Sequence, residues 1–282
     1  MNLREYRKQQ QSLIDGELDR QTPSETMPPQ TIHCAMRYSL FAGGKRIRPI
    51  LCMEAARAVS DDSAGVETAA CALEMVHTYS LIHDDLPALD NDDLRRGKPT
   101  CHKVFGEAMA ILAGDALLTC AFQVLTGLEG VDGARKAAMA LELAAAAGTP
   151  NGMVAGQVAD LEGEGKRPDP ILLESIHRAK TGALIRASLR IGAIYAGASA
   201  AQLEALSCYG EHVGLAFQIV DDLLDVEESS EALGKTAGKD AAQYKITFPS
   251  VYGIEESRRM AEEERARAHE ALKVFGDGVG RL

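Results

Sequence analysis

The chain has 282 residues, of which 46% are hydrophobic and 25% charged, a composition typical of folded globular proteins and unlike that of disordered ones. The formal net charge of −11 argues against nucleic acid as the main partner, because a phosphate polymer requires a basic face. Aromatic residues make up only 5%, and stretches rich in alanine and leucine outnumber β-branched ones. We therefore predict an all-α fold in a single large domain, residues 1–282.

Helix-length segments, about ten in all, alternate with short breakers along the chain. A first helix ends in the loop 21–30, and "SDDSAG" (60–65) caps a helix that runs over 66–86. The loops 162–170 and 234–240 interrupt the second half, and neither is long enough to indicate a domain boundary.

Compartment and membrane contact are predicted from cysteines and hydropathy. The six cysteines contain no CxxC pair and lie mostly among apolar residues, which predicts buried free thiols in a reducing, cytoplasmic environment. The N-terminus is polar and charged, unlike a signal peptide. The most apolar stretch, Ala108–Leu128, is interrupted by Asp115, so we expect no membrane span.

The first unusual motif is "HDDLPALDNDDLRRGKP" at 83–99, where acidic residues are followed at once by basic ones. Pro87 disfavours helical geometry before it, so Asp84 and Asp85 should lie near the end of the helix 66–86. A helix C-terminus is a poor place for carboxylates unless a cation binds, and a break at Pro87 could bring Asp90 back towards Asp84. Oxygen-only ligands suit Mg²⁺ better than Zn²⁺, and a solvated acidic loop is the alternative. An EF-hand is excluded because the loop position that requires glycine is Arg95.

A second carboxylate cluster occurs in "FQIVDDLLD". Gln218, Asp221, Asp222 and Asp225 follow the spacing i, i+3, i+4, i+7, which forms one stripe on an otherwise apolar helix. A surface stripe facing water is one interpretation. If the two clusters instead face each other across a cavity, they would bind several divalent ions and, through them, a polyphosphate.

Basic residues accompany both clusters. "GGKRIRP" places Lys45 and Arg48 after two glycines, and "RRGK" follows the first cluster. His77 lies two helical turns before Asp84, on the same face. Each residue also has an ordinary interpretation, as a solvated lysine or a core histidine. "LGKT" is not a P-loop, because Ser229 stands where that motif requires glycine.

Six motifs in one order give the chain its resemblance to a known family. "GGKRIRP", the segment from "SLIHDDLPALDNDDLRRGKPT" to "GDALL", "GMVAGQVADL", "KTGALI", "FQIVDDLLD" and "LGKTAGKD" resemble those of the trans-isoprenyl diphosphate synthases, most closely the bacterial-type farnesyl diphosphate synthases. The resemblance spans about Arg37 to Gly253. It implies about ten mostly antiparallel helices around a deep central cavity, the isoprenoid synthase fold.

The resemblance also implies a reaction and a homodimer. The expected reaction is Mg²⁺-dependent head-to-tail condensation of isopentenyl diphosphate with dimethylallyl and then geranyl diphosphate, giving farnesyl diphosphate and releasing diphosphate. Family members usually continue through one more C-terminal helix, whose end helps to close the isopentenyl site. The expectation is therefore either that this sequence is a shortened form or that this closure is missing.

The same resemblance assigns roles to individual residues. Three Mg²⁺ ions would be held by the carboxylates of Asp84, Asp85, Asp90, Asp221, Asp222 and Asp225. The allylic diphosphate would be bound by Arg95, Lys180, Thr181, Gln218 and Lys235, with Lys245 a weaker candidate. The diphosphate of isopentenyl diphosphate would be bound by Lys45, Arg48, His77 and Arg96. The residues expected to act in catalysis are Asp84, Asp90, Arg95, Lys180, Thr181 and Lys235, with Thr181 and the Lys180 carbonyl stabilising an allylic cation.

Product length is expected to depend on Tyr79 and Ser80. Tyr79 precedes Asp84 by five residues, about 7.5 Å along a helix axis. An aromatic residue there resembles the pattern of enzymes that stop at fifteen carbons, and ordinary core is the less favoured interpretation of Tyr79. The alternatives are a geranylgeranyl or geranyl diphosphate synthase, a non-catalytic partner subunit, and a terpene cyclase, which would have no use for an isopentenyl pocket.

Overall fold

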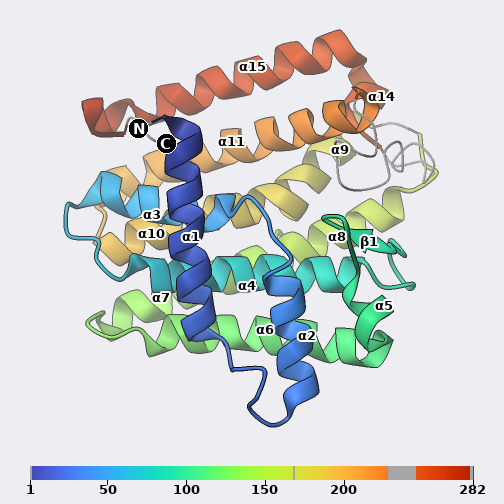
Figure 1. Ribbon diagram of the computed structural model, residues 1–282. Helices are drawn as coiled ribbons and strands as arrows, with labels where there is room; N and C mark the ends of the chain where they lie inside the picture. The colour runs from blue at the N-terminus through green and yellow to red at the C-terminus, as the bar shows by residue number, and fades with distance from the viewer. Residues whose placement is uncertain (1, 168, 228–245, 280–281) are drawn as a thin grey trace.

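The computed structural model describes residues 2–167, 169–227, 246–279 and 282, and within them the protein is almost entirely helical (Figure 1). The prediction of an all-α fold is confirmed. The only strands in this part of the chain form a two-residue hairpin, in which β1 pairs antiparallel with β2. In chain order the elements are α1 (Leu3–Gln21), α2 (Gln30–Leu40), α3 (Ile47–Val59), α4 (Val66–Asp84), β1 (Leu94–Arg95), β2 (Lys98–Pro99), α5 (Cys101–Phe105), α6 (Glu107–Gly127), α7 (Gly133–Ala147), α8 (Met153–Gly163), α9 (Pro170–His177), the π-helix η1 (Arg178–Gly182), α10 (Ala183–Ala196), α11 (Ala200–Glu227), α14 (Phe248–Tyr252), α15 (Ile254–Ala271) and the 3₁₀ segment η2 (Leu272–Val279).

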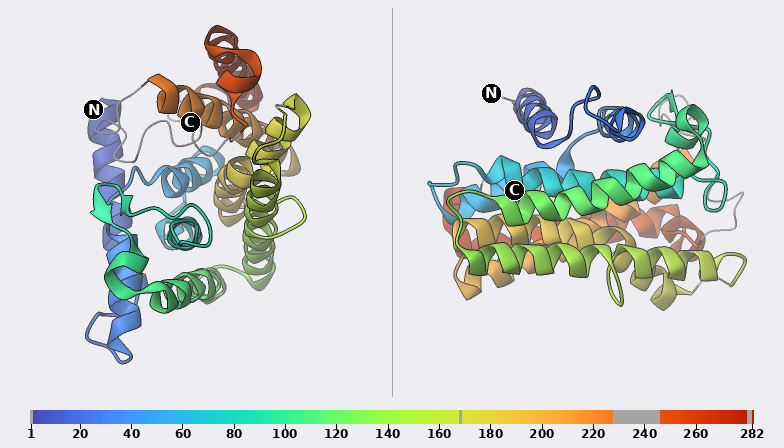
Figure 2. Two further views of the ribbon diagram at one scale, coloured as in Figure 1. Left: turned by 90° about the vertical axis from the view of Figure 1, so that its right-hand side faces the viewer. Right: turned by 90° about the horizontal axis from the view of Figure 1, so that it is seen from below.

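Helix α4 is the centre of the bundle. Its residues are buried on nearly every side, as expected of a helix that is apolar all round. Seen end-on, α4 lies within a ring formed by the other helices (Figure 2). The largest core cluster packs α4 against α1, α3, α6 and α10, so the end of α4 that carries Asp84 is held rigidly.

Helix α6 is long and apolar enough to cross a membrane by length and composition, contrary to the expectation for Ala108–Leu128. In the fold, however, one of its faces packs against α4, with Ala113, Leu117 and Ala121 fully buried. The core helix of a soluble protein passes the same test of length and composition, so this evidence for a membrane span is weak.

Most element boundaries lie where the breakers predict them. Helix α1 ends at Gln21, α2 begins at Gln30, and the loop after α8 ends at Pro170. The start of α4 differs in one respect: Gly65 occupies the N-cap with φ +84°, and no side chain from 60–65 caps the helix. None of the six cysteines forms a disulfide, and four of them are buried.

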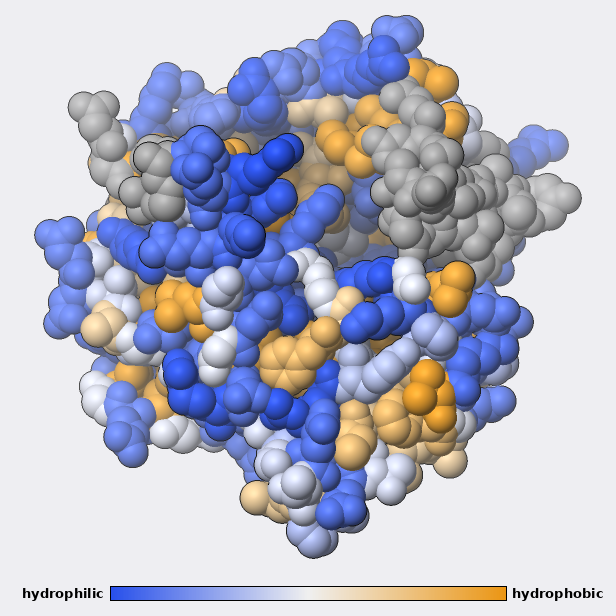
Figure 3. Space-filling view, in the orientation of Figure 1, coloured by the Kyte–Doolittle hydropathy of each residue, from blue (hydrophilic) through white to orange (hydrophobic). Residues whose placement is uncertain are grey.

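Two smaller core clusters hold the C-terminal half. One joins α10 and α11 to α15, and the other packs α9 and α11 against α14. Helix α15 carries Glu–Arg pairs at i, i+3 and i, i+4 along its outer surface. Hydrophilic side chains accordingly dominate the face of the molecule that includes α15, and apolar groups form separate patches (Figure 3).

Candidate active site

A cavity of about 290 Å³ opens between the C-terminal end of α4 and the helices α8, η1 and α11. Its walls combine carboxylates with cationic, polar and a few apolar side chains. The lining residues are Arg48, His77, Leu81, Asp84, Asp90, Asp92, Arg95, Asp160, Ile176, His177, Lys180, Thr181, Phe217, Gln218, Asp221, Asp222, Asp225, Ile246 and Thr247. The structure therefore brings the two predicted carboxylate clusters to one cavity, although they lie more than 120 residues apart in the sequence.

The chain reverses direction directly after α4, as Pro87 predicts. The helix ends at Asp84, and the amide of Asp90 donates to the carbonyl of Asp84 over 2.8 Å. Asn91 then adopts a left-handed conformation with φ +51°, which asparagine tolerates well. Both carboxylates thus face the same cavity. Burial raises the pKa of Asp84 to about 6; Lys180 opposes this shift and Asp90 adds to it.

Asp85 is placed differently from Asp84. It is buried and lies outside the lining of the large cavity, beside a small one. Its carboxylate accepts from Arg95 Nε over 2.9 Å, and Arg95 also contacts Asp92 at 3.3 Å. Burial would lower the pKa of Arg95, but the bond to Asp85 outweighs it and the pKa is raised. The abrupt change of charge in the motif thus produces ion pairs that hold Arg95 at the cavity wall.

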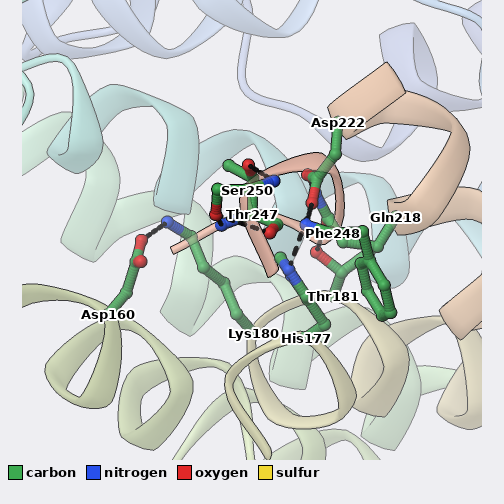
Figure 4. A network of polar contacts seen from close by, with 9 residues as sticks. All are labelled: Asp160, His177, Lys180, Thr181, Gln218, Asp222, Thr247, Phe248 and Ser250. Carbon is green, nitrogen blue, oxygen red and sulfur yellow. Dashed lines mark hydrogen bonds and ion pairs between the residues drawn. The ribbon is translucent and has the colours of Figure 1, made fainter. Parts of the chain in front are cut away.

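The wall opposite Asp84 is built on η1. Gly156 of α8 lets the two backbones approach closely, since a Cβ there would lie 2.2 Å from the backbone nitrogen of Lys180. Lys180 Nζ lies 2.6 Å from Asp160 Oδ2. The next residue, Thr181, donates its hydroxyl to Gln218 Oε1 over 2.9 Å (Figure 4). Short π-helical segments are frequent at functional sites. Here the π-helix η1 places two consecutive predicted site residues on the cavity wall.

The second carboxylate cluster lies on α11. Asp221 and Asp225 line the cavity, and Asp225 is buried. Asp222 is also buried and accepts from Gln218 Nε2 and from the backbone amide of Phe248, each over 2.9 Å. His177 Nε2 lies 3.4 Å from the same carboxylate (Figure 4).

Two of the four predicted isopentenyl residues line the same cavity as Asp84. Arg48 and His77 line the cavity. Burial lowers the pKa of Arg48 to about 10, and burial together with Arg48 holds the pKa of His77 well below its usual value. Arg96 bonds to the carbonyl of Gly43, and Gly44 leaves room for its guanidinium. Lys45 is exposed on this loop, outside the cavity lining.

Tyr79 and Ser80 lie lower on α4, and neither lines the cavity. Tyr79 is buried in the main core and meets the ring of His83 edge-on at 5.7 Å. Ser80 donates to the carbonyl of His77 over 2.9 Å. Lys235 and Lys245 lie outside the described residues.

Three titratable residues of the lining, Asp92, Asp160 and His177, were not assigned a site role by the sequence analysis. Asp160 belongs to a quoted motif, and an acid on an apolar helix was the signal that could have identified it. His177 precedes Lys180 by three residues, but nothing in the sequence indicated its proximity to Asp222. Asp92 is part of the first cluster, and only its bond to Arg95 reveals its place.

The ligand atoms of the site suit Mg²⁺ that is bound partly by substrate phosphates better than a metal ion that is bound by protein side chains alone. The carboxylates on the two rims supply only oxygen ligands. Among the described residues, no three His, Cys, Asp or Glu side chains are close enough to hold one ion. Mg²⁺ commonly binds through one or two carboxylates plus substrate phosphates, which is what two facing rims would permit.

Comparison with known proteins defines the family. Residues 29–275 match the polyprenyl synthetase family model, and the chain belongs to this family. It is 54% identical over 228 residues to the farnesyl diphosphate synthase of Geobacillus stearothermophilus, covering 80% of this chain and 76% of that one. It is also 52% identical over 252 residues to geranylgeranyl pyrophosphate synthase 11, chloroplastic, of Arabidopsis thaliana, covering 88% and 70%.

Solved structures support the same fold. The structure of an FPP/GFPP synthase from Zymomonas mobilis superposes with a TM-score of 0.85 at 37% identity, covering 99% of this chain and 95% of that one. The geranyltransferase of Helicobacter pylori, solved with magnesium and isoprenyl diphosphate, gives 0.81 at 30% identity, covering 95% and 91%. The fold is therefore the isoprenoid synthase fold, and the chain is a prenyltransferase of the trans-prenyl diphosphate synthase type.

Proposed function

We propose that the protein condenses isopentenyl diphosphate with dimethylallyl and then geranyl diphosphate, head to tail, giving farnesyl diphosphate and releasing diphosphate. One observation supports this most directly: both carboxylate clusters, with cations from α3, the β1 region and η1, line a single cavity. An acidic protein can bind a diphosphate only where cations offset its own charge, and this cavity supplies them locally.

We assign the allylic diphosphate to the side of the cavity formed by α11 and η1. Asp84 and Asp90 on one rim and Asp221 and Asp225 on the other would hold three Mg²⁺ ions. These ions, when bound, would stabilise the departing diphosphate. Lys180 and Arg95 place fixed positive charge beside it. Lys235 and Lys245, which the resemblance assigns to the same substrate, lie outside the described residues. Thr181 lines the position where positive charge would develop on the allylic carbon.

We assign the second substrate to the neighbourhood of Arg48 and His77. Arg48 is a half-buried cation on the cavity wall. The lowered pKa of His77 keeps its ring neutral, so it can bind an oxygen without adding charge. Arg96 and Lys45 belong to the loop and turn beside them. The enzyme's own task would be to place the isopentenyl double bond against the allylic carbon and to exclude water from the cation.

Product length separates two candidate functions. The buried aromatic ring of Tyr79, on α4 five residues before Asp84, favours a product that stops at fifteen carbons. The chloroplast relatives named as geranylgeranyl pyrophosphate synthases match at 52% identity, and they favour a twenty-carbon product instead. The difference lies only in the depth available to the growing tail.

One incubation tests the proposal. Pure protein with Mg²⁺, isopentenyl diphosphate and dimethylallyl diphosphate should give a fifteen-carbon diphosphate by chromatography. Asp84→Ala should abolish turnover, whereas Asp93→Ala should be far milder, because Asp93 is exposed and pairs with Lys103 away from the cavity. A twenty-carbon product would favour the second candidate. A cyclic product would indicate a terpene cyclase, and no turnover would favour a partner subunit.

We also propose a cytoplasmic homodimer. Helix α6 exposes Ile111 and Leu112 on the side away from α4, at 45% and 51% exposure. Two copies of an apolar helix face could cover each other. Light scattering should give twice the chain mass, and Leu112→Glu should reduce it to one chain mass.

A further inference from the structure

A polar network surrounds Asp222 at the wall of the cavity, which Asp222 lines together with His177, Thr181 and Gln218. Asp222 Oδ1 accepts from Gln218 Nε2, and Oδ2 accepts from the amide of Phe248, each over 2.9 Å. His177 Nε2 approaches Oδ2 at 3.4 Å, and the His177 ring stacks on Phe248 with 5.4 Å between centroids. The side chain of Asp222 is only 3% exposed, and each of its two oxygens accepts a hydrogen bond from a protein donor (Figure 4).

The direction of every hydrogen bond in this network follows from Asp222. An ionised carboxylate can only accept, so the amide NH₂ of Gln218 must face it. The amide oxygen of Gln218 therefore faces Thr181, and the Thr181 hydroxyl must donate to it. The proton of Thr181 is thereby directed away from the cavity that the residue lines, and its acceptor lone pairs remain available there.

We propose that Asp222 is a positioning residue and not a metal ligand: through the amide of Gln218 it keeps the lone pairs of Thr181 on the cavity. This inference rests on the proposed function, in which Thr181 stabilises a developing allylic cation. A hydroxyl that pointed its proton at that cation would oppose it, so the orientation has consequences for the rate. The amide of Phe248 holds the carboxylate in place, and the ring of His177 stacks on the ring of Phe248.

Asp222→Asn tests these donor and acceptor directions, because it changes the hydrogen bonding of the side chain and hardly changes its shape. The buried amide of Phe248 still requires an acceptor, so the oxygen of the new side chain must face it. The new NH₂ group then faces Gln218, whose amide must turn over to accept. Thr181 would next face an NH₂ group, and its own proton would be free to turn towards the cavity.

A compensating change should restore the original direction. In the double variant Gln218→Glu with Asp222→Asn, the introduced carboxylate accepts both from the new NH₂ group and from Thr181. The number of carboxylates in the network is unchanged. We expect Asp222→Asn to lower the single-turnover rate by about 10- to 100-fold. This is less than the roughly 100- to 1,000-fold lost when a preorganised group is removed, because the Thr181 hydroxyl is still present. The double variant should recover most of the rate.

Metal binding supplies a readout that does not depend on turnover. Calorimetric titration of Mg²⁺ with an unreactive thio analogue of dimethylallyl diphosphate should give the same affinity, within about threefold, for the wild type and Asp222→Asn. Asp221→Asn should weaken it strongly. Glu264→Gln is the structural control, because Glu264 is equally buried and bonds to His212 over 2.6 Å outside the cavity lining. It should lower the melting temperature without changing the rate.

The outcomes separate the possibilities. Loss of Mg²⁺-dependent affinity in Asp222→Asn, equal to that in Asp221→Asn, would overturn the proposal and make Asp222 a ligand. A double variant that folds and binds but is no faster than Asp222→Asn would also overturn it. A wild-type protein that binds neither Mg²⁺ with the analogue nor isopentenyl diphosphate would refute the proposed function itself.

Discussion

The ion pair between Arg46 and Glu74 gives the sharpest stability prediction. Arg46 stands between Lys45 and Arg48, at the N-cap of α3, with φ +52°. Its guanidinium is 1% exposed and lies 2.6 Å from Glu74 of α4, which is 2% exposed. It also contacts the half-exposed Asp15 of α1 at 2.8 Å and donates to the carbonyl of Leu40. Burial acts to lower the pKa of Arg46, but Glu74 and Asp15 outweigh it, so the guanidinium stays charged.

Glu74→Gln should leave that charge with only one acidic partner. Removing one member of a buried pair costs about 3–5 kcal/mol, and the remaining Asp15 favours the lower end, about 3 kcal/mol. The entropy of unfolding is about 2.1 cal/mol/K per residue, about 0.6 kcal/mol/K for this chain, so the melting temperature should fall by about 5 °C. Because Arg46 fixes the loop beside Arg48, the KM for isopentenyl diphosphate should rise as well, while that for the allylic substrate should not.

Thermal melts followed by circular dichroism and steady-state kinetics with each substrate varied check both parts. Glu142→Gln is the matched control, since it removes the partner of Arg190, a pair with 22% and 24% exposure that lies outside the cavity. Its cost should be about 1 kcal/mol. Equal melting temperatures for the two variants would refute the reasoning about burial. An equal rise of both KM values would refute the link to the isopentenyl side.

Three further predictions concern the cavity. Tyr79→Ala should lengthen the product, because it removes a buried ring on α4 five residues before Asp84, and an unchanged chain length by chromatography would contradict this. Mg²⁺-dependent binding of the allylic analogue should weaken as the pH falls through about 6. The reason is that Asp84 has a raised pKa of about 6 and becomes neutral below it. Calorimetry that shows a constant affinity from pH 8 to 5 would contradict this prediction. Gly156→Ala should displace the backbone of Lys180 and lower kcat, whereas Gly16→Ala, which meets no atoms within 4 Å, should leave kcat unchanged.

Periodicity and a single proline were enough to predict much of the site. Pro87 predicted that α4 ends near Asp84 and that Asp90 returns to it, and the amide–carbonyl bond between these residues confirms both. The stripe on α11 was visible as i, i+3, i+4, i+7 spacing. Spacing cannot show which members of a cluster face the cavity, however, because that depends on tertiary partners. Asp85 lies beside Asp84 in the sequence, yet its carboxylate bonds to Arg95 and is not part of the lining of the main cavity.

For the same reason, the sequence could not show that the cations of the cavity are paired with carboxylates. Lys180 stands alone in the chain, yet in the fold Asp160 lies 2.6 Å away, and Arg95 likewise contacts Asp85 and Asp92. A diphosphate entering the cavity must therefore compete with carboxylates for these cations. Competition of this kind favours a ligand that brings divalent ions with it, because ions shared with the carboxylate rims remove the competitors. It follows that a diphosphate without Mg²⁺ should bind weakly on the allylic side, although Lys180 and Arg95 are already in position.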